Sequence, residues 1–363
     1  MHGLTTGQTA IRLEASTVCQ LACPICPTTL GTIKAQLGAG FLKFDAFRRI
    51  VDDNPSLCRI ELSNWGEIFL NKDLDRIVEY AYRRSVALTA WNGVNLNHAR
   101  EHVLESLARY RFRGLSCSID GVSQETYVAY RREGDVQRVL ENIRKLNAYK
   151  KKWKTQYPWL TWQMIAFRHN AHEVDAARAL ARELGMGFLL KTSSDPDFMP
   201  EPPDEASSPG PSGAPGTTRP PQGEDVAWHS CAQLWEEPQI NFDGALLGCC
   251  VNTTSTFGPN VLDVGLARAL ADDRLDYAKR MLLGAAPARA DIPCTSCHVY
   301  AERARTGTWV SRSTPPGIVP FLRRHGMGRT AVWVGNRFER PLAPARALAR
   351  RLRRQTAPAG LDT

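Results

Sequence analysis

Three cysteines near the start of the chain, Cys19, Cys23 and Cys26, stand as Cys-x3-Cys-x2-Cys directly after an apolar-alternating run over residues 11–16. A tight loop of this kind can present three thiolates to three corners of a 4Fe-4S cluster, and the fourth iron can then bind and reduce a small molecule. Structural zinc is the alternative. The spacing is not the paired Cys-x2-Cys that zinc prefers, however, and no histidine completes a nearby quartet. The loop therefore predicts iron-sulfur chemistry.

Short apolar strands alternate with helical patterns through the first half of the chain. We expect strands at residues 11–16, 59–63, 87–91, 114–119, 160–165 and 187–190. A helix follows the N-cap Asp135, and another begins at Asn170 with a capping-box-like Glu173 and stops at Gly185. This alternation predicts an α/β fold with a parallel sheet. Six such units suit a partial (β/α)6 TIM-like barrel, whose site lies at the carboxyl ends of the strands.

The cysteine loop resembles that of the radical S-adenosylmethionine (radical SAM) family, in which the loop follows the first barrel strand with the same spacing. Ile25 takes the place of the apolar or aromatic residue that family members have before the third cysteine. The resemblance implies that Cys19, Cys23 and Cys26 hold a 4Fe-4S cluster. It also implies that S-adenosylmethionine (SAM) is the second cofactor.

The segments after the second and third expected strands are similar to two further motifs of that family. Asn64-Trp65-Gly66-Glu67 looks like its Gly-Gly-Glu segment, with tryptophan in place of the first glycine, and Asn92-Gly93 looks like its Thr-Asn-Gly. The resemblance implies that Gly66 and Glu67 hold the methionine amino group of SAM and that Asn92 lies at the same level. An ordinary turn at the strand end is the alternative for Gly66-Glu67.

The fourth strand runs into a segment that looks like the family's Ser-x-Asp-Gly region. Ser118 and Asp120 are two residues apart and would face one side of a strand, which makes them candidates for the ribose and the methionine head of SAM. Asp120 could instead only form a turn before glycine. Gln163, Arg168 and Lys191, next to strands five and six, could contact SAM or substrate, or could be polar residues of the barrel rim.

A second group of cysteines follows residue 226. It contains Cys231, Cys249, Cys250, Cys294 and Cys297, with a hairpin pattern whose turn is at Asp243-Gly244. This region resembles the SPASM domain of radical SAM enzymes in its shorter twitch form. The resemblance implies a second, auxiliary 4Fe-4S cluster on four cysteines, which are Cys231, Cys249, Cys294 and Cys297. Cys250 could replace Cys249, and structural zinc is the alternative for the quartet.

Composition divides the chain into four parts. We expect a radical SAM barrel over residues 1–195, a Pro/Gly-rich linker or lid over 196–226, the auxiliary domain over 227–315 and a basic tail over 316–363. The tail contributes to the formal net charge of +9. It could bind an anionic membrane surface, nucleic acid or an acidic electron donor, or it could be a solvated helix face.

Ten cysteines without a signal peptide predict a reducing compartment, and we expect a soluble, cytoplasmic protein. Two of the ten, Cys58 and Cys117, lie on apolar strands and are expected to be packed structural residues. No stretch approaches the roughly 20 apolar residues of a membrane helix.

The resemblance implies reductive cleavage of SAM to a 5'-deoxyadenosyl radical, which takes a hydrogen atom from an unactivated carbon of the substrate. With an auxiliary cluster as electron acceptor, it implies a radical SAM oxidoreductase. The closest family resemblance is to twitch-domain dehydrogenases, so we expect oxidation of a sugar or aminocyclitol in natural product biosynthesis. The expected partners are a small-molecule substrate and a flavodoxin- or ferredoxin-like electron donor. Nucleic acid is not expected.

Three other functions stay open. A maturase of ribosomally made peptides uses the same modules, but would require a leader-peptide-binding domain. A radical sugar epimerase or dehydratase is also possible, and an epimerase would use a cysteine hydrogen donor, for which Cys250 is the candidate. From another class, the chain could be a non-catalytic iron-sulfur or zinc protein.

Overall fold

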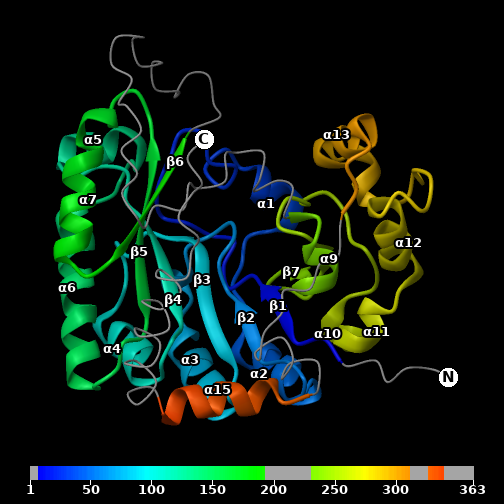
Figure 1. Ribbon diagram of the computed structural model, residues 1–363, viewed down its shortest axis with the longest axis horizontal. Coiled ribbons are helices and arrows are strands. Elements are labelled where there is room, and N and C mark those ends of the chain that lie inside the picture. Colours follow the sequence, from blue (N-terminus) through cyan, green and yellow to red (C-terminus); the bar gives the residue numbers. More distant parts are fainter. Residues whose placement is uncertain (1–6, 193–229, 311–325, 339–363) are drawn as a thin grey trace, which may run out of the picture.

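The computed structural model describes residues 7–192, 230–310 and 326–338 (Figure 1). The expected linker or lid and the arginine-rich end of the tail lie outside these described residues. In the described ranges, no helix is both long enough and apolar enough to cross a membrane.

Six parallel strands form the body of an open sheet, in the order β6-β5-β4-β3-β2-β1. This confirms the predicted α/β class. The strands are β1 (Ala10–Leu13), β2 (Arg59–Glu61), β3 (Ala87–Val94), β4 (Gly114–Ser118), β5 (Trp159–Ala166) and β6 (Gly187–Thr192). Each strand pairs in parallel with its neighbour in sequence, so their carboxyl ends meet at one edge of the sheet.

The two faces of the strands differ in polarity, because successive side chains point to opposite faces. On β1, Ile11 and Leu13 belong to the main hydrophobic core, whereas Arg12 is buried in polar contacts. Helices cover the apolar face (Figure 1). They are α2 (Phe44–Asp53), α3 (Leu74–Arg83), α4 (Glu101–Arg109), α5 (Gln124–Tyr130), α6 (Val136–Lys152) and α7 (Val174–Glu183). The other face, lined by polar side chains, is left for the site.

The helix ends test two capping predictions. Asp135 caps α6 as predicted, since its carboxylate accepts a hydrogen bond from the Arg138 N–H. The prediction of a capping box at Asn170 is wrong, because the chain forms a 3-10 turn over Ala171–Glu173 before α7 begins. Asn170 uses its amide for Phe167, Asp120 and Ile165 instead of for a helix end. The Glu173 carboxylate accepts hydrogen bonds from the backbone N–H groups of residues 122 and 123.

The predicted hairpin forms from β7 (Gln239–Ile240) and β8 (Leu246–Gly248), with Gly244 at φ 92° in its turn. It also extends the barrel sheet, because β7 pairs in parallel with β1. Helical segments follow and hold the last two cysteines. They are α10 (Val261–Val264), α11 (Leu266–Leu270), α12 (Asp273–Leu282), η5 (Pro293–Ser296) and α13 (His298–Thr306), and α9 (Gln233–Glu236) precedes the hairpin.

One helix beyond the auxiliary region is described, α15 (Gly328–Arg337), and it crosses beneath the sheet at the end opposite the cysteine loop (Figure 1). The Arg329 guanidinium donates hydrogen bonds to the backbone carbonyls of Val51, Asn54 and Leu57. These contacts attach part of the expected tail to the barrel.

Candidate functional site

The first cysteine loop leaves β1 and is held in apolar surroundings. Cys19 and Cys26 pack against a small cluster formed by Leu21, Cys23, Tyr130 and Phe167. The thiols are free of disulfides. The pKa of Cys19 is raised to about 12, mainly by burial and to a smaller extent by the nearby carboxylate of Glu67. Thiolates in such a site need a positive partner, which an iron cluster would supply.

Gly66 and Glu67 lie directly against this loop. A side chain at Gly66 would collide with the backbone, since a Cβ there would lie 2.7 Å from the Val18 nitrogen. The Glu67 carboxylate is buried and accepts hydrogen bonds from the N–H groups of Phe69 (3.1 Å) and Asn95 (2.6 Å). Burial raises the pKa of Glu67 to about 7, although these donors oppose the shift. Glu67 therefore fixes the loop that faces the cysteines.

Asn92 connects the strand ends to the auxiliary region. Its amide donates to Asn64 Oδ1 (2.5 Å), and Asn64 in turn donates to the backbone carbonyl of Cys250 (3.2 Å). Since Asn64 precedes Trp65, Gly66 and Glu67, the candidate SAM segment and the second cysteine group share one hydrogen-bonded link.

Ser118 and Gln163 meet on the polar face of the sheet, where the Gln163 amide donates to the Ser118 hydroxyl (3.4 Å). Asp120 is fully buried just beyond them. Its carboxylate accepts from the Ile165 N–H (2.7 Å) and from Arg131 Nε (2.6 Å). Both carboxylate oxygens of Asp120 thus have protein donors.

Sequence reasoning missed the contact that Arg131 makes with the first cysteine loop. Its Nη1 donates to Cys23 Sγ (3.8 Å) while its Nε donates to Asp120. Burial raises the pKa of Cys23, and the positive charge of Arg131 opposes that shift. No local pattern could have revealed a contact between residues so far apart in the sequence.

Glu14, at the carboxyl end of β1, was also missed. Only 1% of the residue is exposed, and its carboxylate accepts from the Trp65 N–H (3.2 Å). Burial raises the pKa of Glu14 to about 8, against the opposing effect of backbone N–H groups at residues 64–66. The signal that could have found it is the alternation of Arg12 and Glu14 with apolar residues on this strand.

Lys191 and Arg168, the remaining candidates of the barrel rim, differ in burial. Lys191 projects from β6, and burial lowers its pKa while the charge of Asp120 opposes the shift. Arg168 lies in the exposed turn after β5. Of these two, Lys191 is the one near the polar centre of the sheet.

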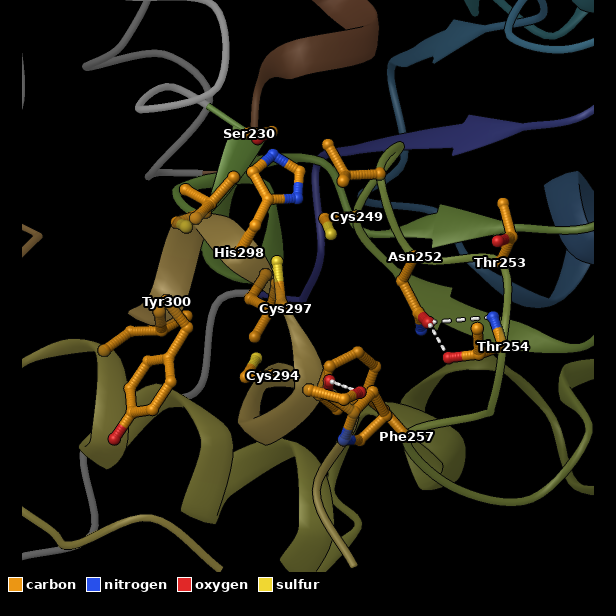
Figure 2. Close-up of a pocket in the computed structure, with 17 residues that line it drawn as sticks. Ser230, Cys249, Asn252, Thr253, Thr254, Phe257, Cys294, Cys297, His298 and Tyr300 are labelled. Carbon is orange, nitrogen blue, oxygen red and sulfur yellow. Dashed lines mark hydrogen bonds between the residues drawn. The ribbon is translucent and has the colours of Figure 1, made fainter. Parts of the chain in front are cut away.

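Four cysteines of the second group line one pocket (Figure 2). Its volume is about 170 Å³, and Cys231, Cys249, Cys294 and Cys297 all contribute to its wall. Burial raises the pKa of Cys249 to about 12 and also raises that of Cys294. In the described ranges, no three His, Cys, Asp or Glu side chains are grouped as a single metal ion would need.

Cys250 does not line that pocket and is hydrogen-bonded to Gln233. Its N–H donates to Gln233 Oε1 (2.8 Å), and Gln233 Nε2 donates to its sulfur (3.5 Å). Gln233 thus holds both the backbone N–H and the sulfur of Cys250. Cys58 and Cys117 are buried in the barrel core, as predicted.

Comparisons with known proteins fit this arrangement. Residues 13–160 match the family model of the Radical SAM superfamily. SuiB from Streptococcus suis, solved bound to S-adenosylmethionine, is 13% identical with a TM-score of 0.55 over 82% of this chain and 72% of that chain. SuiB bound to its precursor peptide SuiA gives 12% identity and a TM-score of 0.54 over 82% and 71%.

The protein anSMEcpe with bound AdoMet is 11% identical, with a TM-score of 0.51 over 91% of this chain and 94% of that chain. No curated protein matches the sequence. At such identities the structural likeness shows a shared fold, and the family model adds that residues 13–160 match the Radical SAM superfamily.

Proposed function

We propose that Cys19, Cys23 and Cys26 hold a 4Fe-4S cluster that works with SAM. The observation that carries the proposal is the loop itself, in which three disulfide-free thiols lie against an apolar cluster and the Arg131 guanidinium contacts Cys23. The donor set fits the group, because clusters are held by cysteine thiolates and tuned by hydrogen bonds to their sulfurs. When bound, the cluster and SAM supply the one-electron chemistry that removes a hydrogen atom from an unactivated carbon.

The chain's polar residues would bind and orient SAM beside that loop. Backbone groups at Gly66 are within reach because this residue has no side chain, and Glu67 holds their position. Ser118 and Gln163 present a hydroxyl and an amide that suit ribose hydroxyls. Asp120 acts through Arg131, since its own oxygens are engaged by protein donors.

We further propose that the pocket of the second group holds an auxiliary 4Fe-4S cluster on Cys231, Cys249, Cys294 and Cys297. Four thiols on one cavity wall match the ligand number of a complete cluster, which would supply an electron acceptor. In this proposal the barrel extends over residues 1–195 and the auxiliary domain over 227–315. The pairing of β7 with β1 supports a fixed distance between the two groups.

The reaction we propose is oxidation of a sugar or aminocyclitol. After hydrogen-atom removal from a carbon that bears a hydroxyl, the substrate must still lose one electron and one proton. The auxiliary group would take the electron, and Lys191 Nζ is the proposed proton acceptor, because burial favours its neutral form. Arg168 at the rim would contribute to substrate binding.

Peptide maturation is the second candidate. The likeness to SuiB, which was solved with a precursor peptide, covers 82% of this chain. Supplying candidate sugars and candidate peptides to the loaded protein, and following substrate mass, separates the two reactions. A sugar product lighter by two hydrogens supports dehydrogenation. A change in the mass of a peptide would instead support peptide maturation and contradict the proposed sugar oxidation.

Iron content with electron paramagnetic resonance on anaerobically prepared protein tests the cluster assignment. About eight irons per chain are expected for two cubane clusters. Cys249→Ala should remove the auxiliary signal, whereas Cys250→Ala, its matched neighbour, should keep it. About four irons in the unaltered protein, or equal effects of the two variants, would contradict the auxiliary assignment.

A further inference from the structure

We propose that each cysteine group carries one buried arginine that raises the reduction potential of its cluster: Arg131 acts on the group of Cys19, Cys23 and Cys26, and Arg303 acts on the auxiliary group. This inference rests on the proposed function. It adds to it a pair of positioning residues, one for each centre, whose effects can be measured independently.

Arg131 is held in one orientation against the first group. Its side chain is 14% exposed, with Nε bound to Asp120 Oδ2 and Nη1 directed at Cys23 Sγ. Its guanidinium also lies 5.4 Å from the ring centre of Tyr130. The contacts leave the cation little freedom to turn toward solvent.

Asp120 in turn is fixed by the end of β5. The Ile165 N–H donates to its second carboxylate oxygen, and Asn170 Nδ2 donates to its backbone carbonyl (2.9 Å). This explains why Asn170 does not cap a helix. A chain of hydrogen bonds therefore runs from Asn170 through Asp120 to Arg131 and ends on the sulfur of Cys23. It fixes the position of the guanidinium relative to the proposed cluster ligand.

Arg303 is a buried arginine of the auxiliary region. It lies on α13, the helix that begins directly after Cys297, and only 4% of the residue is exposed. Its Nη1 donates to the Thr308 carbonyl (2.9 Å), which closes the turn after the helix. Arg303 also makes a side-chain hydrogen bond to Cys231, a proposed ligand of the auxiliary cluster.

The direction of the effect follows from electrostatics. Reduction adds negative charge to a cluster, and a nearby cation or hydrogen-bond donor stabilises the reduced form more than the oxidised form. Both guanidiniums are shielded from water. Charges interact more strongly in the protein interior than at the surface. Removing either arginine should therefore lower the potential of its own centre only.

Potentiometric titration followed by electron paramagnetic resonance, without SAM, measures this directly. In Arg131→Met the first centre should become at least tenfold harder to reduce, about 59 mV for one electron, while the auxiliary centre is unchanged. In Arg303→Met the pattern should be reversed. Each centre thus acts as the internal control for the other, and omission of SAM removes any effect on SAM binding.

Exposed neighbours provide matched controls. Arg132→Met adjoins Arg131, and Arg305→Met removes a cation from α13 that pairs with Glu302 at the surface. Neither should shift a potential. Where a methionine variant does not load iron, Arg131→Gln and Arg303→Gln keep a donor without the charge and should give a smaller shift in the same direction.

The outcomes separate the inference from the function beneath it. Eight irons with unchanged potentials in both arginine variants would overturn the inference and leave the proposed function standing. Four irons in the unaltered protein would overturn the auxiliary assignment and the Arg303 half with it. A shift of both centres by either variant would contradict a local electrostatic effect.

Discussion

Two single residues set the geometry at the end of β1. Gly66 lets its segment lie against the backbone of Ser16 and Val18, and Glu14 receives the Trp65 N–H from the same segment. Neither residue needs to touch a substrate for this. A close backbone approach and a buried carboxylate together hold the Asn64–Glu67 segment next to the cysteine loop, and each makes a prediction.

Gly66→Ala should disturb this approach. Its Cβ has no room, so the segment must shift, and overpacking of this kind costs about 1–3 kcal/mol. We expect 5'-deoxyadenosine formation to fall at least tenfold. Gly187→Ala is the control, because a Cβ there would have its nearest neighbour at 3.5 Å. Equal activity of the Gly66 variant and the parent would contradict the assigned packing.

Glu14 should make stability depend on pH. Its pKa is raised to about 8 in the folded chain from the ordinary value of 4.5, so the folded state binds the proton more tightly. The stabilisation is fully present below about pH 4.5 and is lost as pH rises toward 8, with a slope of at most about 1.4 kcal/mol per pH unit. Urea unfolding of the metal-free protein from pH 5 to pH 8 measures it.

Glu14→Gln should flatten that dependence, because the amide oxygen still accepts from Trp65 but carries no titrating proton. If the variant and the parent lose stability with the same slope, Glu14 is not the group responsible.

At the scale of elements, hydrogen bonding by one side chain decides where a helix starts. Asp135 does what its position before an apolar helical pattern predicts. Asn170 has a similar local pattern, yet its amide is taken by groups of β5 and by the Asp120 carbonyl. Local propensity therefore succeeded where no tertiary partner competed and failed where one did.

Asp135→Ala should destabilise the protein by about 1 kcal/mol, since the first turn of α6 loses an acceptor for the Arg138 N–H. Asp135→Asn keeps a capping oxygen and should be close to neutral. Denaturant unfolding of the two variants compares them, and a loss of similar size in both would show that charge rather than capping is responsible.

The hairpin shows which features of an element can be predicted from the sequence and which cannot. Its turn could be predicted from Asp243-Gly244, because the signal is local. Its pairing with β1 could not, because the bonds from Arg12 to Pro238 and from Glu14 to Ile240 join residues more than 200 positions apart. The same holds at the site: cysteine spacing was readable, whereas the contacts of Arg131 with Cys23 and of Arg303 with Cys231 depend on the fold.

At the scale of the whole molecule, the sheet connects both cysteine groups and α15 closes the opposite end. Arg329 of α15 donates hydrogen bonds to one carbonyl in the last turn of α2 and to two carbonyls after it. The chain thus returns to the barrel after the auxiliary region. The composition of the tail predicted a basic segment but gave no indication of this contact.

Arg329→Ala should cost about 1–3 kcal/mol in unfolding free energy, because three carbonyls in part-buried hydrogen bonds lose a charged donor. Arg337→Ala, on the exposed end of the same helix, should change little. Urea unfolding of both variants tests the difference. An unchanged Arg329 variant would mean that α15 does not contribute to barrel stability.

The central claim is that three cysteines of one loop hold the cluster at which SAM is cleaved. The most direct measurement is 5'-deoxyadenosine formed from SAM under reducing, anaerobic conditions by the parent and by a Cys19→Ala, Cys23→Ala, Cys26→Ala triple variant with unchanged circular dichroism. The account predicts product from the parent and none above background from the variant. Undiminished product from the variant would contradict it.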